Sequence, residues 1–212
     1  SDVDLIVLYG AGGVEVTEGR RPLDPLNWFA KATKALVTAL SAPTAAGKLY
    51  EVDMRLRPSG RQGPVATALS SFDRYQREEA WTWEHMALTR ARVLAGEASL
   101  AEDIERIRCE VIETVPDRER IVTDAATMRA RVAAAGRSGG TWLVKEGPGG
   151  MQDIELLSQA GTLIAGRAER RPSAQLAAAA DAGWLDAAEA GALREAHALY
   201  ASVNQSGRLL TD

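Results

Sequence analysis

The sequence predicts an α/β domain followed by an all-α domain. A β-branched, mostly apolar run over residues 3–9 is typical of a buried strand, and residues 49–57 alternate between apolar and polar side chains as a second strand does. From about residue 97 onward, apolar residues recur at helical spacing instead. We therefore expect an α/β domain over residues 1–96 and a helical domain over residues 97–212.

Loops and helices alternate with the strands of the first domain. A glycine-rich loop over residues 10–21 precedes Asp24-Pro25, where an aspartate N-cap and a proline at the first helical position predict a helix to about residue 42. The remaining elements follow in chain order: a turn-rich loop at 58–64, a helix capped by Ser70 or Ser71 and reaching residue 79, and a helical stretch over 81–94 that ends at Gly96.

The second domain is expected to be helical throughout. Its apolar stripes and breakers predict helices at 100–112, 121–132, 151–165, 173–180 and 186–203, with glycine-rich loops at 136–140 and 147–150 and a short apolar segment at 142–144. The pattern is typical of a helical bundle.

Composition and charge exclude several classes of protein. With 46% hydrophobic and 25% charged residues, the 212-residue chain is globular. Its net charge of −4 gives no overall attraction to nucleic acid or anionic membranes, and we expect neither as a partner. A single cysteine, Cys109, excludes a disulfide framework and favours the cytoplasm. The longest apolar runs fall far short of the ~20 residues that a membrane span needs.

Two aspartates on the first strand are candidate metal ligands. Asp2 and Asp4 are two residues apart, so their side chains leave the same face of a strand. Carboxylates placed in this way can hold a pair of divalent ions for phosphoryl or nucleotidyl transfer, and hard oxygen ligands suit Mg²⁺. From this pair alone we prefer the alternative, a solvated strand end, and metal-binding Asp-x-Asp also occurs in sugar-nucleotide transferases.

A third carboxylate strengthens the metal hypothesis. Asp53 lies on the polar face of the second strand and completes a cluster with Asp2 and Asp4 if the two strands are neighbours. Clustered acids repel one another unless a cation is present. The alternative is that Asp53 simply pairs with a nearby arginine. Glu51 faces the same way, either supporting the ligands or exposed to solvent.

The segment after Asp53 is locally basic. Five arginines stand there against Asp73 alone: Arg55, Arg57, Arg61, Arg74 and Arg77. Arginine binds phosphate oxygens bidentately, so a triphosphate beside a carboxylate-bound metal would use such residues. For the last three arginines we prefer the alternative, a solvated surface with ion pairs.

Several segments resemble the bacterial glutamine synthetase adenylyltransferase family. Four of them occur in the family's order and spacing: SDVDLIVLY at 1–9, YEVDMRLRPSG at 50–60, YQREEAWTWEH at 75–85 and RARVLAG at 90–96. A fifth, KEGPGGMQDIE at 145–155, is similar to a motif of the helical domain that follows in the family. The resemblance thus spans most of the chain.

The resemblance implies a truncated polymerase-β-like nucleotidyltransferase domain followed by a helical bundle domain. It implies Mg²⁺-dependent transfer of AMP from ATP to a tyrosine of glutamine synthetase, with a PII-type signalling protein as a further partner. In that family's pattern, Asp2, Asp4 and Asp53 match the metal-binding carboxylates, and we expect Arg55 and Arg57 to contact phosphate.

The family enzyme is bifunctional: one half adenylylates glutamine synthetase and the other half removes the AMP. Residues around the motifs indicate which half this chain resembles. Glu51 and the segment 81–85 resemble the adenylylating half more than the deadenylylating half. The family also has a strand and a glycine-rich turn just before the first motif. We expect this chain to be a fragment of a longer protein that lacks this strand and turn, and not to be fully active without them. The alternatives are the deadenylylating half, which removes AMP by phosphorolysis, and a non-catalytic docking module.

Overall fold

The chain forms two compact units. The computed structural model describes residues 2–45, 47, 50–114, 117–135 and 144–211. One unit comprises Ser1–Ala80 with Ala95–Ile104, and the other comprises Trp81–Leu94 with Glu105–Asp212. Within the described ranges, no helix combines the length and the apolar character needed to cross a membrane.

The first unit contains two short parallel strand pairs. β1 (Asp2–Asp4) pairs with β3 (Glu51–Asp53), and β2 (Leu8–Tyr9) pairs with β4 (Thr67–Ala68). The strand predicted at residues 3–9 is therefore an extended run that changes partner. The Leu5 N–H still donates to the Asp53 carbonyl at 2.8 Å, and then Val7 accepts from the Thr67 N–H at 3.0 Å. The change of partner follows because the chain leaves the sheet after Asp53 and returns only at Thr67.

The second predicted strand is shorter than its alternation suggests. Polar and apolar residues alternate over 49–57, but strand structure ends at Asp53 and the chain turns through Met54–Arg57, where the Arg57 N–H bonds to the Met54 carbonyl at 3.3 Å. A run of alternating side chains does not indicate where hydrogen-bonded pairing stops, because the partner strand decides it.

Helices cover the strand pairs of the first unit. α1 (Pro25–Ser41) begins as predicted, with the Asp24 carboxylate accepting from the Asn27 N–H at 3.0 Å. Tyr9 of β2 stacks on Phe29 of α1, their ring centroids 4.4 Å apart. The short η1 (Gly60–Gln62) precedes α2 (Leu69–Glu78). The serine cap predicted for α2 is wrong: the helix begins at Leu69, and Ala68 is an N-cap without a side-chain hydrogen bond.

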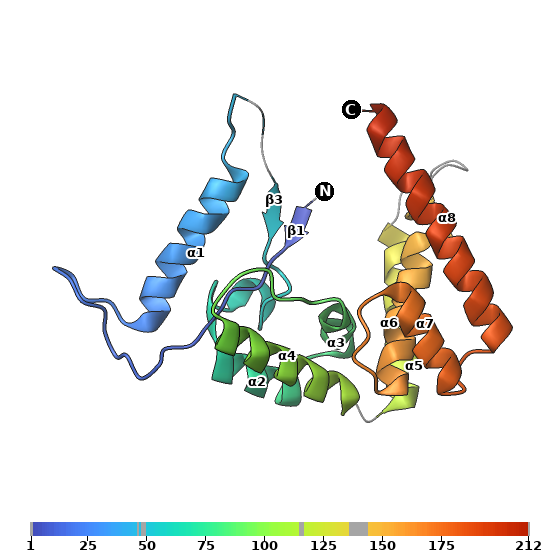
Figure 1. The fold of residues 1–212 in the computed structure, drawn as a ribbon, viewed down its shortest axis with the longest axis horizontal. Coiled ribbons are helices and arrows are strands. Elements are labelled where there is room, and N and C mark those ends of the chain that lie inside the picture. The colour runs from blue at the N-terminus through green and yellow to red at the C-terminus, as the bar shows by residue number, and fades with distance from the viewer. Residues whose placement is uncertain (1, 46, 48–49, 115–116, 136–143, 212) are drawn as a thin grey trace. The chain divides into compact units, whose positions relative to one another are not determined.

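The second unit is a helical bundle (Figure 1). Its elements are α3 (Thr82–Thr89), the later part of α4 (Ala98–Glu113), α5 (Arg118–Ala135), α6 (Met151–Ala165), α7 (Pro172–Asp181) and α8 (Ala187–Thr211). α6 lies at the centre, packed against α3, α5, α7 and α8. The main core cluster contains Met86, Ile112, Ile121, Ala160, Leu163 and Ile164. The predicted loop at 136–140 and most of the apolar segment 142–144 lie outside the described residues.

The division by contacts differs from the boundary drawn from the sequence. Trp81–Leu94, which the sequence places before residue 97, packs with the helical unit. The reason is Met86 of α3, which is 1% exposed and belongs to the core cluster with Ile121 and Leu163. The first seven residues of α4, through Ile104, belong with the first unit instead. The limit at residue 96, taken as a boundary between domains, stays a prediction.

A buried arginine joins three segments of the helical unit. The Arg108 side chain on α4 is only 2% exposed. Its guanidinium donates to the carbonyls of Leu88 at 3.2 Å, Thr89 at 2.6 Å and Ala168 at 2.9 Å, and to the Glu105 carboxylate at 3.0 Å. Burial lowers the pKa of Arg108 from its usual value. The four hydrogen bonds offset the free-energy cost of removing the charged guanidinium from water.

Replacing Arg108 by methionine leaves the buried carbonyls of Leu88 and Thr89 and the partly buried carbonyl of Ala168 without this donor. We expect the free energy of unfolding to fall by about 3–5 kcal/mol, because each buried carbonyl left without a partner costs about 1–3 kcal/mol. Urea denaturation followed by circular dichroism measures the change. The matched control is Arg106→Met on the same helix, where the side chain is 55% exposed and forms an ion pair with Glu110 at the surface, so a change within about 0.5 kcal/mol is expected. Equal losses for the two variants would contradict the role of Arg108.

A glycine allows α6 and α7 to approach closely. A Cβ at Gly161 would lie 2.7 Å from the Ala179 Cβ and 3.0 Å from the Trp184 ring. We therefore expect Gly161→Ala to destabilise the bundle by about 1–3 kcal/mol through overpacking. Gly191→Ala in α8 is the control, because its Cβ would meet open space and alanine favours helix by up to about 1 kcal/mol. Thermal unfolding should shift in opposite directions for the two variants, and a stabilised Gly161→Ala would refute the close approach.

Candidate active site

The register of the β1–β3 pair brings two of the predicted carboxylates together. Asp4 lies directly opposite Asp53, and Asp2 lies opposite Glu51, so the expectation that the two strands are neighbours is confirmed (Figure 1). Because partners in register share a face of the sheet, Asp4 and Asp53 project from the same side at a strand separation of about 4.8 Å. The side chain of Asp2 is outside the described part of the structure.

Asp53 is held by the arginine that follows it by two residues. One carboxylate oxygen accepts from the backbone N–H of Arg55 at 2.8 Å and the other from the Arg55 Nε at 2.6 Å, and a further guanidinium nitrogen completes an ion pair. These hydrogen bonds, aided by the positive charges of Arg55 and Arg61, lower the pKa of Asp53. The pairing with an arginine that the sequence offered as an alternative is therefore present.

The donor set fits a hard divalent cation. Carboxylate oxygens are the ligands that Mg²⁺ prefers, and Asp4 and Asp53 contribute them from adjacent strands. Among the described side chains no three of histidine, cysteine, aspartate or glutamate are grouped closely enough to hold a metal. Asp2 is the third ligand that the sequence predicts, and its side chain is not among them. Arg55 is 63% exposed, so its side chain can turn away and free one oxygen of Asp53.

Arg57 is engaged with the backbone of its own loop. Its Nη1 donates to the Met54 carbonyl at 2.7 Å, its Nε to Gly63 at 3.2 Å and its other Nη to Arg61 at 3.3 Å. Arg55 and Arg57 were both expected to contact phosphate. The structure places Arg55 against Asp53 and Arg57 inside the loop.

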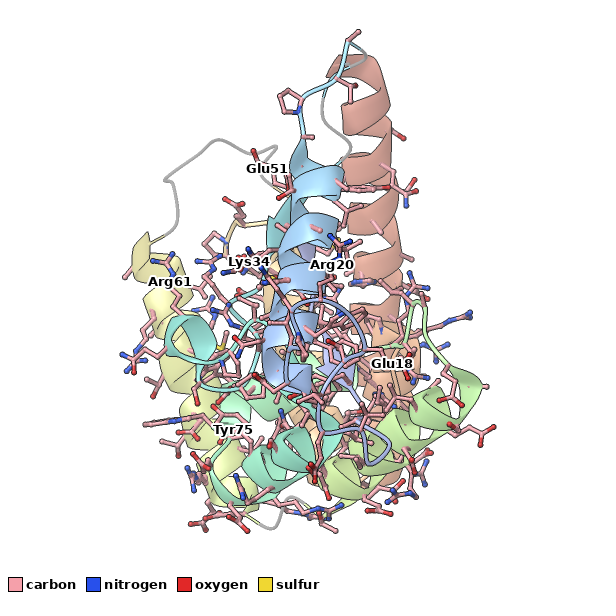
Figure 2. All side chains as sticks on the ribbon, turned by 90° about the vertical axis from the view of Figure 1, so that its left-hand side faces the viewer. Glu18, Arg20, Lys34, Glu51, Arg61 and Tyr75 are labelled. Atoms are coloured by element: carbon pink, nitrogen blue, oxygen red, sulfur yellow. The ribbon has the colours of Figure 1, made fainter. Side chains whose placement is uncertain are left out.

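The other charged residues of this segment lie at the surface. Glu51 and Arg61 are exposed, at the start of β3 and in η1 respectively (Figure 2). Arg77 pairs with Asp73 one helical turn earlier, at 2.6 Å, as the preferred alternative for Arg77 anticipated. Arg74 is also exposed.

A second charged cluster, in the helical unit, was not predicted. Glu155 on α6 pairs with Arg90 at 3.0 Å and lies 3.5 Å from the Nε2 of His197 on α8. Arg129 on α5 pairs with Asp153 at 2.9 Å. The cluster borders a cavity of about 150 Å³ between α5 and α6. Sequence spacing gave no signal for it, because the charges come from four separate helical segments.

The Gly149-Gly150 segment has a local structural role. Asp153 accepts from the Gly149 N–H at 2.8 Å, and a Cβ at Gly150 would lie 2.7 Å from the carbonyl of Gly147 and of Val144. Gly149 has φ +72°, a conformation that favours glycine. Asp153 thus satisfies a backbone donor beside the start of α6, as expected for an acid at a helix N-terminus.

Removing the Arg55 side chain should raise the pKa of Asp53. In Arg55→Gln the strongest hydrogen bond to the carboxylate is lost, while the backbone N–H bond remains. A folded-state pKa below the unfolded value stabilises the fold above the unfolded pKa, and this contribution disappears as pH falls through the folded pKa. The variant should therefore lose stability at a higher pH than the parent.

Carboxyl ¹³C NMR titration of Asp53 measures this shift directly. Arg77→Gln is the control, because Arg77 pairs with Asp73 and should leave the titration midpoint of Asp53 unchanged. An unaltered midpoint in Arg55→Gln would mean that the ion pair does not persist in solution.

The chain is similar to known enzymes along its whole length. Residues 1–107 match the family model described as glutamate-ammonia ligase adenylyltransferase, and residues 126–212 match the model described as GlnD PII-uridylyltransferase. Bifunctional glutamine synthetase adenylyltransferase/adenylyl-removing enzymes are 46% identical in Xanthobacter autotrophicus, 43% in Agrobacterium fabrum and 41% in Mesorhizobium japonicum. These alignments cover 99–100% of this chain but only 22% of each relative. The chain belongs to the glutamate-ammonia ligase adenylyltransferase family.

Proposed function

We propose that the chain carries the nucleotidyl-transfer site of the adenylylating half of a bifunctional enzyme, which moves AMP from ATP to a tyrosine of glutamine synthetase. The observation that carries the proposal is the β1–β3 register, which sets Asp4 opposite Asp53 inside the segment that matches the adenylyltransferase family model. We infer further that the first unit is part of a polymerase-β-like nucleotidyltransferase domain.

Asp2, Asp4 and Asp53 are the residues proposed to hold Mg²⁺. When bound, the ions would neutralise phosphate charge during an in-line displacement. Asp53 is well suited to serve as a ligand because the hydrogen bonds from Arg55 that lower its pKa favour the ionised form of the carboxylate. The backbone N–H of Arg55 fixes one of its oxygens even when the Arg55 side chain moves away.

The chemical step transfers an adenylyl group to oxygen. The tyrosine oxygen forms a bond to the α-phosphorus of ATP, the bond from that phosphorus to the bridging oxygen breaks, and pyrophosphate leaves with the bonding electrons. The hydroxyl proton passes to the carboxylate of Asp53. The guanidinium of Arg55 is 63% exposed, and a rotation that takes it from Asp53 to the phosphates would let its planar group bond two phosphate oxygens.

The relatives' names support glutamine synthetase as the protein substrate. The match of residues 126–212 to a PII-uridylyltransferase model supports a PII-type signalling protein as a partner of the helical unit. We propose that the protein acts in the cytoplasm, where ATP and the enzymes of nitrogen assimilation are present.

Removing a proposed ligand should abolish transfer. In the full-length gene product, we expect Asp4→Asn and Asp53→Asn each to lower the rate by more than about 100-fold, since changes merely adjacent to a metal site cost 10- to 100-fold. Radiolabelled ATP and unmodified glutamine synthetase give the rate of AMP incorporation. The control is Asp73→Asn, an aspartate of the same unit whose partner is Arg77, and it should retain the parental rate.

The same variants test the competing functions. Release of AMP from adenylylated glutamine synthetase in the presence of phosphate, without incorporation from ATP, would replace the proposal by the deadenylylating function. Retention of incorporation in Asp53→Asn would exclude this site. Loss in both aspartate variants, with activity intact in Asp73→Asn, supports it.

A further inference from the structure

We propose that Arg57 is a positioning residue, which shapes the loop behind Asp53 and takes no part in binding the nucleotide phosphates. This inference rests on the proposed function, because the loop from Met54 to Gly63 directly follows the carboxylate assigned to that reaction. It departs from the sequence-based expectation that Arg57 contacts phosphate.

The hydrogen bonds of Arg57 all go to the loop backbone. Every nitrogen of the guanidinium group donates to a different carbonyl, those of Met54, Gly63 and Arg61. No carboxylate partner of Arg57 occurs among the residues whose placement is described. All three nitrogens of the Arg57 guanidinium are thus bonded to backbone carbonyls. If the guanidinium bound a phosphate instead, these carbonyls would lose their hydrogen bonds from Arg57.

The loop needs such a support because its backbone is tightly folded. Ser59 has φ +57° and Gly60 has φ +53°, and the former is costly for a residue with a side chain. A Cβ at Gly63 would lie 1.9 Å from the Pro58 carbonyl oxygen, so the two ends of the turn are nearly in contact. Strained positions of this kind persist only where the surroundings fix them, and Arg57 bonds to both sides of the turn.

The loop is connected to the candidate site through two adjacent residues. The shortest bond of Arg57 goes to the carbonyl of Met54, which directly follows Asp53. The next amide, the N–H of Arg55, donates to the Asp53 carboxylate at 2.8 Å. The Met54 carbonyl and the Arg55 N–H belong to one planar peptide unit. When Arg57 holds this carbonyl in place, it therefore also fixes the direction of the Arg55 N–H, which bonds the Asp53 carboxylate.

Arg57→Lys and Arg57→Gln separate positioning from phosphate binding. Lysine keeps the charge but cannot bond three carbonyls from a planar fork, whereas glutamine removes the charge. In the full-length gene product, we expect both variants to lower kcat for AMP transfer by about 10- to 100-fold while the KM for ATP stays at the parental value. We also expect amide hydrogens in residues 54–63 to exchange faster in both. Arg61→Ala is the exchange control, because only the carbonyl of Arg61 accepts from Arg57.

Two results would overturn the positioning role. One is a higher KM for ATP in Arg57→Gln together with a nearly parental KM in Arg57→Lys. That result would indicate that the positive charge of residue 57 binds the phosphates of ATP. The other is unchanged hydrogen exchange in residues 54–63. The exchange measurement does not depend on catalysis, so it decides the role of Arg57 even if Asp53→Asn retains transfer activity and the proposed function fails.

Discussion

Parallel pairing of β1 with β3 is the constraint on which the candidate site depends. Side chains alternate between the two faces of a strand, so a shift of one residue in register would move Asp53 to the face opposite Asp4. Only three residue pairs define this register, and the bond from the Leu5 N–H to the Asp53 carbonyl extends it by one step. The same backbone carbonyl thus secures the sheet at the residue whose side chain is proposed to act.

Asp53 in the first unit and Arg108 in the second are stabilised by different kinds of partner. Asp53 keeps its counterion two residues away in the sequence, so the pair forms without help from distant parts of the chain. Arg108 takes its main acceptors from backbone carbonyls of distant segments and is almost completely enclosed. The first arrangement permits exchange of partners near the surface, whereas the second fixes the packing of several helices.

Local signals predicted the helices better than the strands. The Asp24-Pro25 start of α1 and the predicted limits of α6 at residues 151 and 165 are confirmed, because caps and breakers act within a few residues. The partner change within residues 3–9 was not predictable, since pairing depends on where the chain returns from a loop. Ser70 and Ser71 failed as caps because strand β4 runs directly into α2.

The candidate site was predictable to the level of residue type and face. The spacing of Asp2 and Asp4 and the polar position of Asp53 anticipated the facing pair, while the roles of these residues stay proposals. The hydrogen bonds of Arg57 could not be predicted from the sequence, because their acceptors are backbone carbonyls. Every residue has a backbone carbonyl, so no residue type marks the ones that Arg57 contacts. The approach of His197 to Glu155 was hidden for a related reason: the two residues lie on different helices, and nothing in their sequence spacing connects them.

The contacts of Arg108 also impose an order on folding. Its bond to the Ala168 carbonyl joins residues separated by 60 positions, whereas its bonds to Leu88 and Thr89 span only 20 and 19. Synthesis proceeds from the N-terminus, so the guanidinium emerges long before its last acceptor does. Until α5 and α6 have been made and have docked, this side chain is best solvated by water, because closing the long loop carries an entropic cost that few contacts yet offset. Complete enclosure of Arg108 therefore waits until the segment that carries Ala168 has been synthesised and has docked.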